Sequence, residues 1–230
     1  MTNHIVNSYD KELERITKLV VEMGLLVRDL LHIAEQSLRD PEADLLPLAR
    51  ATDKKVNALD TEIERQATAI LALRQPMAID LRMAISALRI AVIMERMGDL
   101  AKNTVKRRAK MTMPLSENIT RQVSAMITII ASMMEHALTA FQEKNTQQAY
   151  EVVLRDGEVD IIYHQLMDEL QQDLLNFPQA ALSILQVIFA VRNIERIGDY
   201  TSKTANMVHY ILAGEKVVKP KLKPTPPESS

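Results

Sequence analysis

The pattern of apolar and polar residues along the chain predicts six long helices. In six segments apolar residues recur every three or four positions, the spacing of one face of an α-helix. Residues that end helices separate the segments, as at Asp40-Pro41, Arg74-Gln75-Pro76 and Asn145-Thr146. Gly214 stands where a glycine commonly terminates the last helix. The predicted helices span residues 8–39, 42–73, 78–110, 116–144, 146–175 and 178–213.

The two halves of the chain repeat one pattern, which indicates an internal duplication. Asp53-Lys-Lys-Val56 aligns with Asp156-Gly-Glu-Val159, and the motif Glu-Arg-x-Gly-Asp occurs at residues 95–99 and 195–199. We therefore predict an all-α fold of two tandem antiparallel three-helix bundles related by internal duplication. The predicted domains are residues 1–111, residues 112–214 and a disordered tail, rich in Pro and Lys, at residues 215–230.

Composition supports helices and excludes several kinds of site. Apolar residues make up 47% of the chain and aromatic residues only 3%, with five Gly and no Trp, which favours helices over a turn-rich β fold. The chain has no Cys, which excludes disulfides, thiolate metal sites and Cys nucleophiles. A net charge of -2 gives no reason to expect nucleic-acid binding. Without a signal peptide or an uncharged apolar run of about 18 residues, we expect a cytoplasmic protein with no membrane span.

Each copy of the motif places two carboxylates four residues apart, on one face of a helix. The pairs are Glu95 with Asp99 and Glu195 with Asp199. The first pair continues an apolar stripe at residues 81–92 that we predict to face the core, and a matching stripe precedes the second pair. Carboxylates in such places are costly unless a positive group neutralises them.

The second helix of each half is expected to complete the acidic cluster. In an antiparallel bundle the start of the second helix faces the end of the third, so its acids meet the motif acids of the same half. Converging carboxylates suit a divalent or trivalent metal such as Mg²⁺, Mn²⁺, iron or Ca²⁺, with zinc a further candidate. Because Asn57 replaces a carboxylate, we predict the second half to be the better site, with Lys203 as a competing cation. The predicted metal ligands are Asp156, Asp160, Glu195, Asp199, Asp53, Glu95 and Asp99.

Two other interpretations of the acids remain open at this point. They could pair with Arg96, Arg192 and Arg196 in a metal-free helical scaffold, and Lys102 and its basic neighbours are interpreted as a solvated helix end. They could also belong to a helical-bundle carboxylate metalloenzyme, but the Glu-x-x-His signature of that class is absent. No phosphate-binding loop, dinucleotide loop or nucleophile elbow is present, so we expect a protein without enzymatic activity.

A resemblance to a known family rests on these motifs together. Arg74-Gln75-Pro76, Asp80-Leu81-Arg82 and the two Glu-Arg-x-Gly-Asp motifs, in this order over nearly the whole chain except the tail, resemble the PhoU family. Its members are accessory proteins of the bacterial phosphate-specific transport system. The resemblance implies two tandem three-helix bundles and a cytoplasmic, non-catalytic negative regulator of the phosphate-starvation response. Some members bind metal ions through Glu/Asp-x-x-x-Asp pairs.

The resemblance also implies partners. Family members are thought to link the ATPase subunit of the phosphate transporter to a membrane sensor histidine kinase of a two-component system. The protein would then modulate phosphate uptake and meet the membrane only indirectly, through these partners. A homodimer is also expected, because exposed apolar faces of helical bundles often pair.

Overall fold

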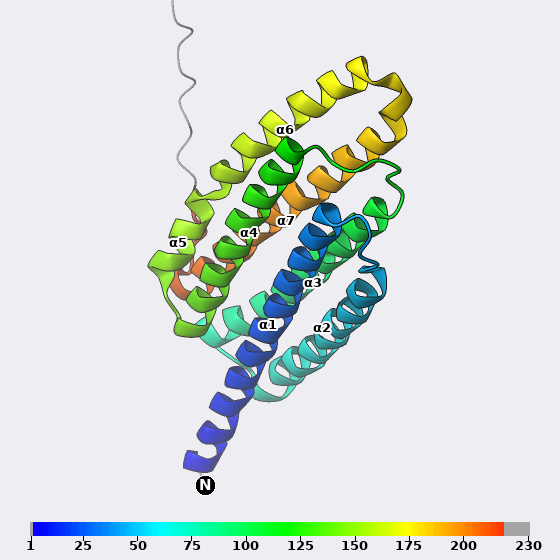
Figure 1. Ribbon diagram of the computed structural model, residues 1–230. Helices are drawn as coiled ribbons and strands as arrows, with labels where there is room; N and C mark the ends of the chain where they lie inside the picture. Colours follow the sequence, from blue (N-terminus) through cyan, green and yellow to red (C-terminus); the bar gives the residue numbers. More distant parts are fainter. Residues whose placement is uncertain (1, 219–230) are drawn as a thin grey trace, which may run out of the picture.

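The computed structural model describes the backbone of residues 2–218 and the side chains from Tyr9 onward, and this part of the chain contains helices and no strand (Figure 1). The elements are α1 (Thr2–Arg39), α2 (Leu46–Arg74), α3 (Ala78–Arg108), α4 (Glu117–Glu143), α5 (Thr146–Leu154), α6 (Asp156–Asn176), the short 3₁₀ helix η1 (Pro178–Ala180) and α7 (Ala181–Ala213).

The helices form two bundles that share one hydrophobic core. The first bundle is α1–α3, and the second is α4–α7. The bundles meet where α3 packs along α7 and α1 packs along α4 (Figure 1). One continuous cluster of buried residues runs through both bundles, including Leu31 in α1, Met97 in α3, Ile130 in α4 and Ile194 in α7. The prediction of two tandem three-helix bundles is confirmed, while the exact domain boundaries stay predictions.

Several predicted helix boundaries differ from the structure, among them the start of the first helix, which begins at Thr2 instead of residue 8. The second helix begins at Leu46 instead of residue 42, with a proline in its first turn, where a missing N–H costs little. The fifth predicted helix is broken at Arg155 into α5 and α6, next to Gly157, a residue with weak helix propensity. The sixth begins as the 3₁₀ turn η1. It ends as predicted at Gly214, which has a left-handed φ of 83°.

The motif glycines let helices approach each other. A Cβ on Gly98 would lie 3.4 Å from Leu30 of α1 and 3.5 Å from Val56 of α2. A Cβ on Gly198 would lie 3.3 Å from Val159 of α6. Both glycines therefore serve close packing of the third helix of their bundle against its neighbours.

The turn between α2 and α3, which carries the Arg74-Gln75-Pro76 motif, holds separate helices together. The Arg74 guanidinium donates two hydrogen bonds to the Glu12 carboxylate of α1, at 3.0 and 2.6 Å. Arg82 donates from Nε to the carbonyl of Ile211 at 3.0 Å and so caps the last turn of α7. The arginines at both ends of the Arg-Gln-Pro…Asp-Leu-Arg segment thus have structural roles, one within the first bundle and one between the bundles.

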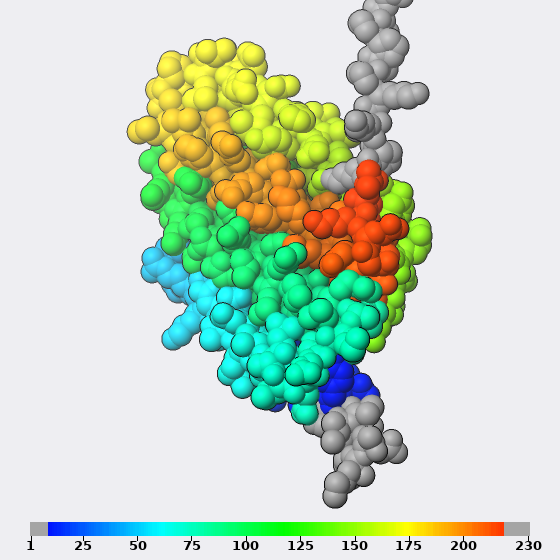
Figure 2. Space-filling model, turned by 180° about the vertical axis from the view of Figure 1, so that it is seen from behind, coloured from blue at the N-terminus to red at the C-terminus, as the bar shows by residue number. Residues whose placement is uncertain are grey.

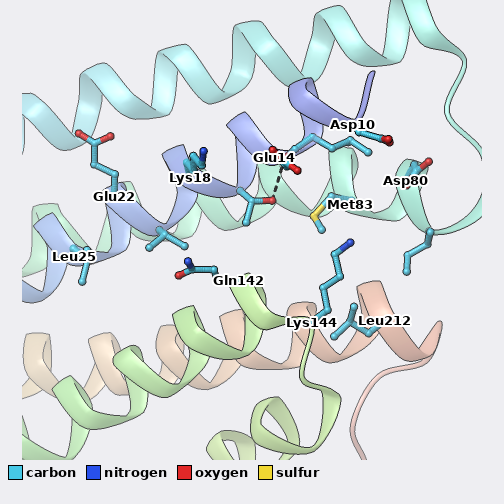
Figure 3. A pocket seen from close by; sticks show the side chains of 14 residues that line it. Asp10, Glu14, Lys18, Glu22, Leu25, Asp80, Met83, Gln142, Lys144 and Leu212 are labelled. Carbon is cyan, nitrogen blue, oxygen red and sulfur yellow. Dashed lines mark hydrogen bonds between the residues drawn. The ribbon is translucent and has the colours of Figure 1, made fainter. Parts of the chain in front are cut away.

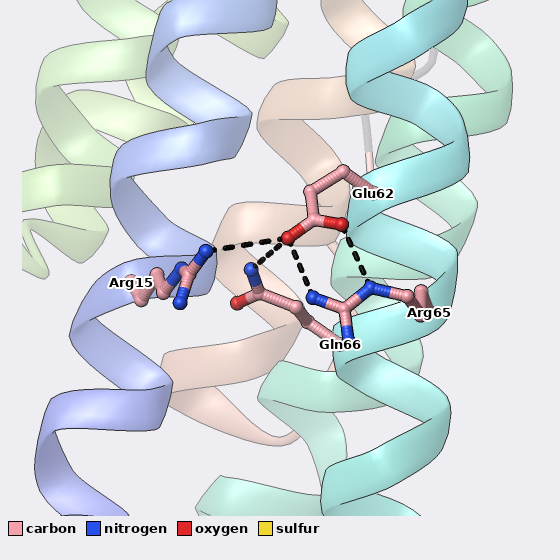
Figure 4. Close-up of polar contacts among 4 residues, drawn as sticks. All are labelled: Arg15, Glu62, Arg65 and Gln66. Carbon is pink, nitrogen blue, oxygen red and sulfur yellow. Dashed lines mark hydrogen bonds and ion pairs between the residues drawn. The ribbon is translucent and has the colours of Figure 1, made fainter.

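A hydrogen-bonded carboxylate on α2 lies opposite α1 (Figure 4). Glu62 accepts two hydrogen bonds of 2.8 Å from Arg65 and one from Gln66, and Arg15 of α1 lies 3.4 Å away. The hydrogen bonds from Arg65 and then Gln66 lower the pKa of Glu62 to about 2. The group therefore stays ionised at physiological pH and keeps the link between α1 and α2.

One helix among the described residues resembles a membrane span in length and composition. α4 has a long apolar window, but 56% of that window is buried inside the bundle. The bent pair formed by α5–α6 and η1–α7 passes the same criterion with a 112° bend. A buried core helix meets this criterion equally well, so the finding is weak support for a span.

The structure describes only the first residues of the predicted tail, up to residue 218. Val217 exchanges two hydrogen bonds with the Asn206 side chain, at 3.1 and 3.2 Å, so the first tail residues lie along α7. The rest of the predicted disordered segment, residues 219–230, lies outside the described residues.

Candidate functional site

The apolar stripe that leads to Glu95 and Asp99 faces outward, which corrects the prediction that it faces the core. Leu81, Ile85 and Val92 are 38%, 36% and 46% exposed. The buried face of α3 lies on the opposite side and is lined by small and flexible residues such as Ala84, Ala87 and Met94. The first half of α3 carries apolar residues nearly all round, so periodicity alone did not identify its core face.

The corresponding stripe of α7 lies at the margin of the core. Val191 is fully buried, whereas Ile184 and Ile188 are partly buried. Glu195 and Asp199, which follow this stripe, are likewise partly exposed. The prediction is therefore closer to the structure in the second half than in the first.

In the first half a lysine lies between two of the predicted metal ligands. Lys102 Nζ is 2.6 Å from Asp53 Oδ2 and 2.8 Å from Asp99 Oδ1. Asn103 also donates a hydrogen bond to Asp99, at 3.1 Å. Asp53 and Lys102 are largely buried, with side chains 10% and 13% exposed. The cation that the acids were predicted to need is thus the chain's own ammonium group, which replaces the interpretation of Lys102 as a solvated helix end.

The sequence analysis missed Asp60, a further member of the first cluster. Burial raises the pKa of Glu95, and the charges of Asp99, Asp60 and Asp53 raise it further, against an opposing effect of Lys102. Burial and Glu64 raise the pKa of Asp60 itself. The signal was available, because Asp60 follows Asp53 by seven residues and so lies on the same face of α2.

In the second half the counter-charge lies farther from the acids. Burial raises the pKa of Glu195, and the charges of Asp199 and Asp160 raise it further, against an opposing effect of Arg192 and Arg196. Lys203 Nζ is 3.7 Å from Asp199 Oδ2, with both side chains about half exposed. Asp156 is buried in the first turn of α6. This cluster therefore holds closely spaced negative charge with a looser ion pair than that of Lys102.

The carboxylates as they stand do not form a closed metal site. Among the side chains from Tyr9 to Val218, no three His, Asp or Glu residues are arranged so that they could hold a metal ion. In the first half Lys102 also stands where a cation would bind two predicted ligands. The assignment of metal ligands to both halves stays a prediction.

A basic and aromatic surface lies on the outer side of α3 and α7, the two helices at the centre of Figure 2. Arg196 donates a hydrogen bond to the Tyr200 hydroxyl at 3.3 Å, and Lys203 lies 4.9 Å from the centre of the Tyr200 ring. The hydrogen bond from Arg196 lowers the pKa of Tyr200, and Arg96 contributes in the same direction. Arg107 lies 4.6 Å from the centre of the Phe189 ring. We call this surface the α3–α7 face; its residues are Arg96, Arg107, Phe189, Arg196, Tyr200 and Lys203.

Comparison with known proteins accounts for both bundles. The family model of the PhoU domain matches residues 20–107 and 123–208. A phosphate-specific transport system accessory protein PhoU homolog of Caulobacter vibrioides is 37% identical over 233 residues, covering 96% of this chain and 98% of the relative. The homolog of Pseudomonas aeruginosa is 30% identical over 221 residues, covering 94% and 90%.

Solved structures agree with this match. The crystal structure of PhoU from Pseudomonas aeruginosa is 30% identical and superposes with a TM-score of 0.85, covering 90% of this chain and 100% of that one. PhoU from Streptococcus pneumoniae, at 24% identity and a TM-score of 0.84, supports the fold alone. The two matched ranges fall on the two bundles, and each contains one Glu-Arg-x-Gly-Asp motif. The chain therefore belongs to the PhoU family.

Proposed function

We propose that this chain is a non-catalytic negative regulator of the phosphate-starvation response that also modulates phosphate uptake. In this proposal it acts in the cytoplasm as an adaptor between the ATPase subunit of the phosphate transporter and a sensor histidine kinase. It meets the membrane only through these partners. The observation that carries the proposal is the match, over almost the whole chain, to proteins named accessory proteins of phosphate-specific transport.

The surface chemistry supports a protein-binding role. The α3–α7 face combines Arg96 and Arg196 with the aromatic residues Tyr200 and Phe189, and residues of these types are enriched where proteins bind each other. Because this face is basic, we assign it to an acidic surface on one of the two partners.

Binding measurements with purified partners test the adaptor proposal. The full chain is titrated against the transporter ATPase and against the cytoplasmic part of the kinase, at high and low phosphate. We expect binding to both, and we expect the Arg96→Glu/Arg196→Glu variant to bind one of them at least tenfold more weakly. The matched control is Arg50→Glu/Lys54→Glu, which makes the same charge change on exposed residues of α2. Binding to neither partner contradicts the adaptor role, and equal weakening by both variants contradicts the assignment of the face.

We further propose that the chain forms a homodimer through the outward stripe of α3. Leu81, Ile85 and Val92 expose apolar surface on one helix face, which is the kind of patch that pairs in water. Sedimentation velocity should show a dimer that the Ile85→Lys/Val92→Lys variant converts to a monomer. Leu73→Lys/Met77→Lys changes two even more exposed apolar residues elsewhere and should leave the dimer intact. A parent chain that is monomeric at micromolar concentration would refute the homodimer proposal.

We also propose that a divalent cation binds preferentially to the second acidic cluster. The support is the mutual repulsion among Glu195, Asp199 and Asp160, in contrast to the close lysine pairing in the first half. Binding would require changes of side-chain rotamer, since no three ligands converge at present. Calorimetric titration with Mn²⁺ should show binding that Glu195→Gln/Asp199→Asn abolishes and Glu95→Gln/Asp99→Asn leaves. Equal loss in both variants, or no binding by the parent chain, would rule the proposal out.

A further inference from the structure

An open groove of about 670 Å³ lies between the two bundles at one end of the molecule (Figure 3). Its upper wall in Figure 3 is the first half of α1 with the start of α3, and its lower wall is formed by the ends of α4 and α7. Its volume is in the range of pockets that bind ligands. The groove is separate from both acidic clusters and from the α3–α7 face.

The groove arises because α1 extends past the end of α4. The two helices cross closely at Gly24, where a Cβ would lie within 2.8 Å of Leu138 Cδ1. Nearby, Arg28 of α1 pairs with Glu135 of α4 at 2.8 Å. α4 then ends at Glu143, while α1 continues toward its N-terminus. The groove is thus the continuation of the α1–α4 interface without a helix to fill it.

The floor of the groove is apolar. Val21 of α1 and Leu212 of α7 are partly buried, and Met83 of α3 is 6% exposed. Leu25 and Ile79, which also line the groove, are 38% and 41% exposed. A partner that covers these side chains gains hydrophobic free energy.

The rim of the groove is mainly acidic. Asp10, Glu14 and Glu22 line the groove from α1, and Asp80 at the start of α3 lies near Asp10 on the same wall (Figure 3). Only two lysines, Lys18 and Lys144, line the same space, so the charged lining carries a net charge of about -2. This rim repels a free phosphate and attracts a cationic partner.

We propose that this groove binds a basic amphipathic helix of a partner protein. Such a helix would lie along α1 beyond the end of α4. Its apolar face would contact the floor of the groove, and its Lys or Arg side chains would contact the acidic rim. From Asp10 to Glu22, α1 offers about 18 Å of wall, enough for about three helical turns. The inference does not depend on the adaptor proposal, because it concerns the chemistry of the occupant and not the identity of the protein that supplies it.

The chain's own basic tail is the alternative occupant. The direction of the chain after Gly214 argues against the tail. Val217 forms hydrogen bonds with the Asn206 side chain, so the chain turns back along α7 and away from Leu212, which lines the groove. The helix-in-groove mode also needs a helix, whereas residues 215–230 hold four prolines.

Binding of a defined peptide tests the proposal. The probe is a synthetic 14-residue helical peptide of Leu and Lys at amphipathic spacing, with a fluorophore, and its control has every Lys replaced by Glu. We expect the Lys peptide to bind and the Glu peptide not to bind. The Glu14→Lys/Glu22→Lys variant should weaken it at least tenfold, whereas Glu42→Lys/Glu64→Lys, on exposed residues outside the groove, should not. Equal weakening by both variants indicates non-specific charge attraction and overturns the proposal.

Crosslinking locates the bound peptide, because the chain has no cysteine of its own. A peptide with one central cysteine should form a disulfide with the Thr17→Cys variant, in the groove, and not with Glu64→Cys on α2. The reverse pattern, or equal reaction at both positions, overturns the proposal. If the full-length Thr17→Cys/Leu222→Cys variant instead closes an internal disulfide that excess peptide does not prevent, the groove belongs to the tail and the proposal is likewise overturned.

Discussion

At the scale of single residues, the two acidic clusters differ in what balances their charge. Lys102 forms short ion pairs with two carboxylates, whereas Ser202 stands at the equivalent position of the second motif. Lys203 lies at a looser 3.7 Å from one carboxylate. The first copy of the motif therefore has a lysine held close to two of its acids, whereas the lysine of the second copy pairs with Asp199 at a longer distance. The difference is set by one residue just outside the motif and predicts different responses to substitution.

Lys102→Ser replaces the lysine of the first half with serine, the residue at the equivalent position 202 of the second half. The buried Asp53 carboxylate then loses its ion-pair partner, and we expect the free energy of unfolding to fall by about 2–4 kcal/mol in chemical denaturation. Lys203→Ser breaks only an exposed pair and should cost less than about 1 kcal/mol. If Lys102→Ser lowered the free energy of unfolding no more than Lys203→Ser, the ion pair with Asp53 would not stabilise the fold.

Glu195→Gln should stabilise the protein at neutral pH. Because the pKa of Glu195 is raised on folding, the folded state binds its proton more readily, and the ionised group opposes folding once the pH rises above its ordinary value. Removing the charge should raise the melting temperature at pH 7 by about 1–2 °C. The gain should shrink as the pH falls to about 4, where the unfolded chain also binds the proton. Melting is measured with EDTA present, and a loss of stability at pH 7 would show that the carboxylate is a needed partner.

At the scale of helices, glycines and chain breaks decide how closely the elements pack. Gly24 sets the α1–α4 crossing, and the difference in length between these helices leaves the groove beside it. Gly98 and Gly198 allow close packing in the third helix of each bundle. The break at Arg155 ends α5 and lets α6 begin with its acids at the second cluster.

Gly24→Ala tests the helix crossing. An added Cβ collides with the buried Leu138 side chain, and overpacking of this kind costs about 1–3 kcal/mol. Gly157→Ala is the matched control, since a Cβ there meets nothing within 4 Å and alanine favours a helix. The melting temperature should therefore fall for Gly24→Ala and stay equal or rise for Gly157→Ala. A neutral Gly24→Ala would mean that Leu138 moves aside freely and that the crossing is loose.

At the scale of the whole molecule, the two bundles behave as one folding unit in our interpretation. One cluster of buried residues spans both, and Arg82 caps α7 from α3. Hydrogen bonds between Arg107 and Gln186 and between Thr112 and Ser183 add links between the halves. We therefore expect the two bundles to unfold together.

We expect a single cooperative unfolding transition. Differential scanning calorimetry should give equal calorimetric and van't Hoff enthalpies, because exposing one bundle uncovers the core face of the other. Arg82→Ala should lower the melting temperature without splitting the transition. Two resolved transitions in the parent chain would contradict the shared core and support independent bundles.

The sequence by itself determined the helices, the duplication and the family. Periodicity, helix-ending residues and the repeated motif are local properties of the chain, and they placed α1, α3 and α4 to within a few residues, apart from the start of α1, which the structure extends to Thr2. The tertiary structure alone decided which face of α3 is buried, because apolar residues surround its first half and only packing against α1, α2 and α7 selects a side. It also brought Lys102 to Asp53, residues that lie on different helices, and it left the groove where α1 outruns α4. These features depend on the relative placement of helices, which residue spacing within one helix does not specify.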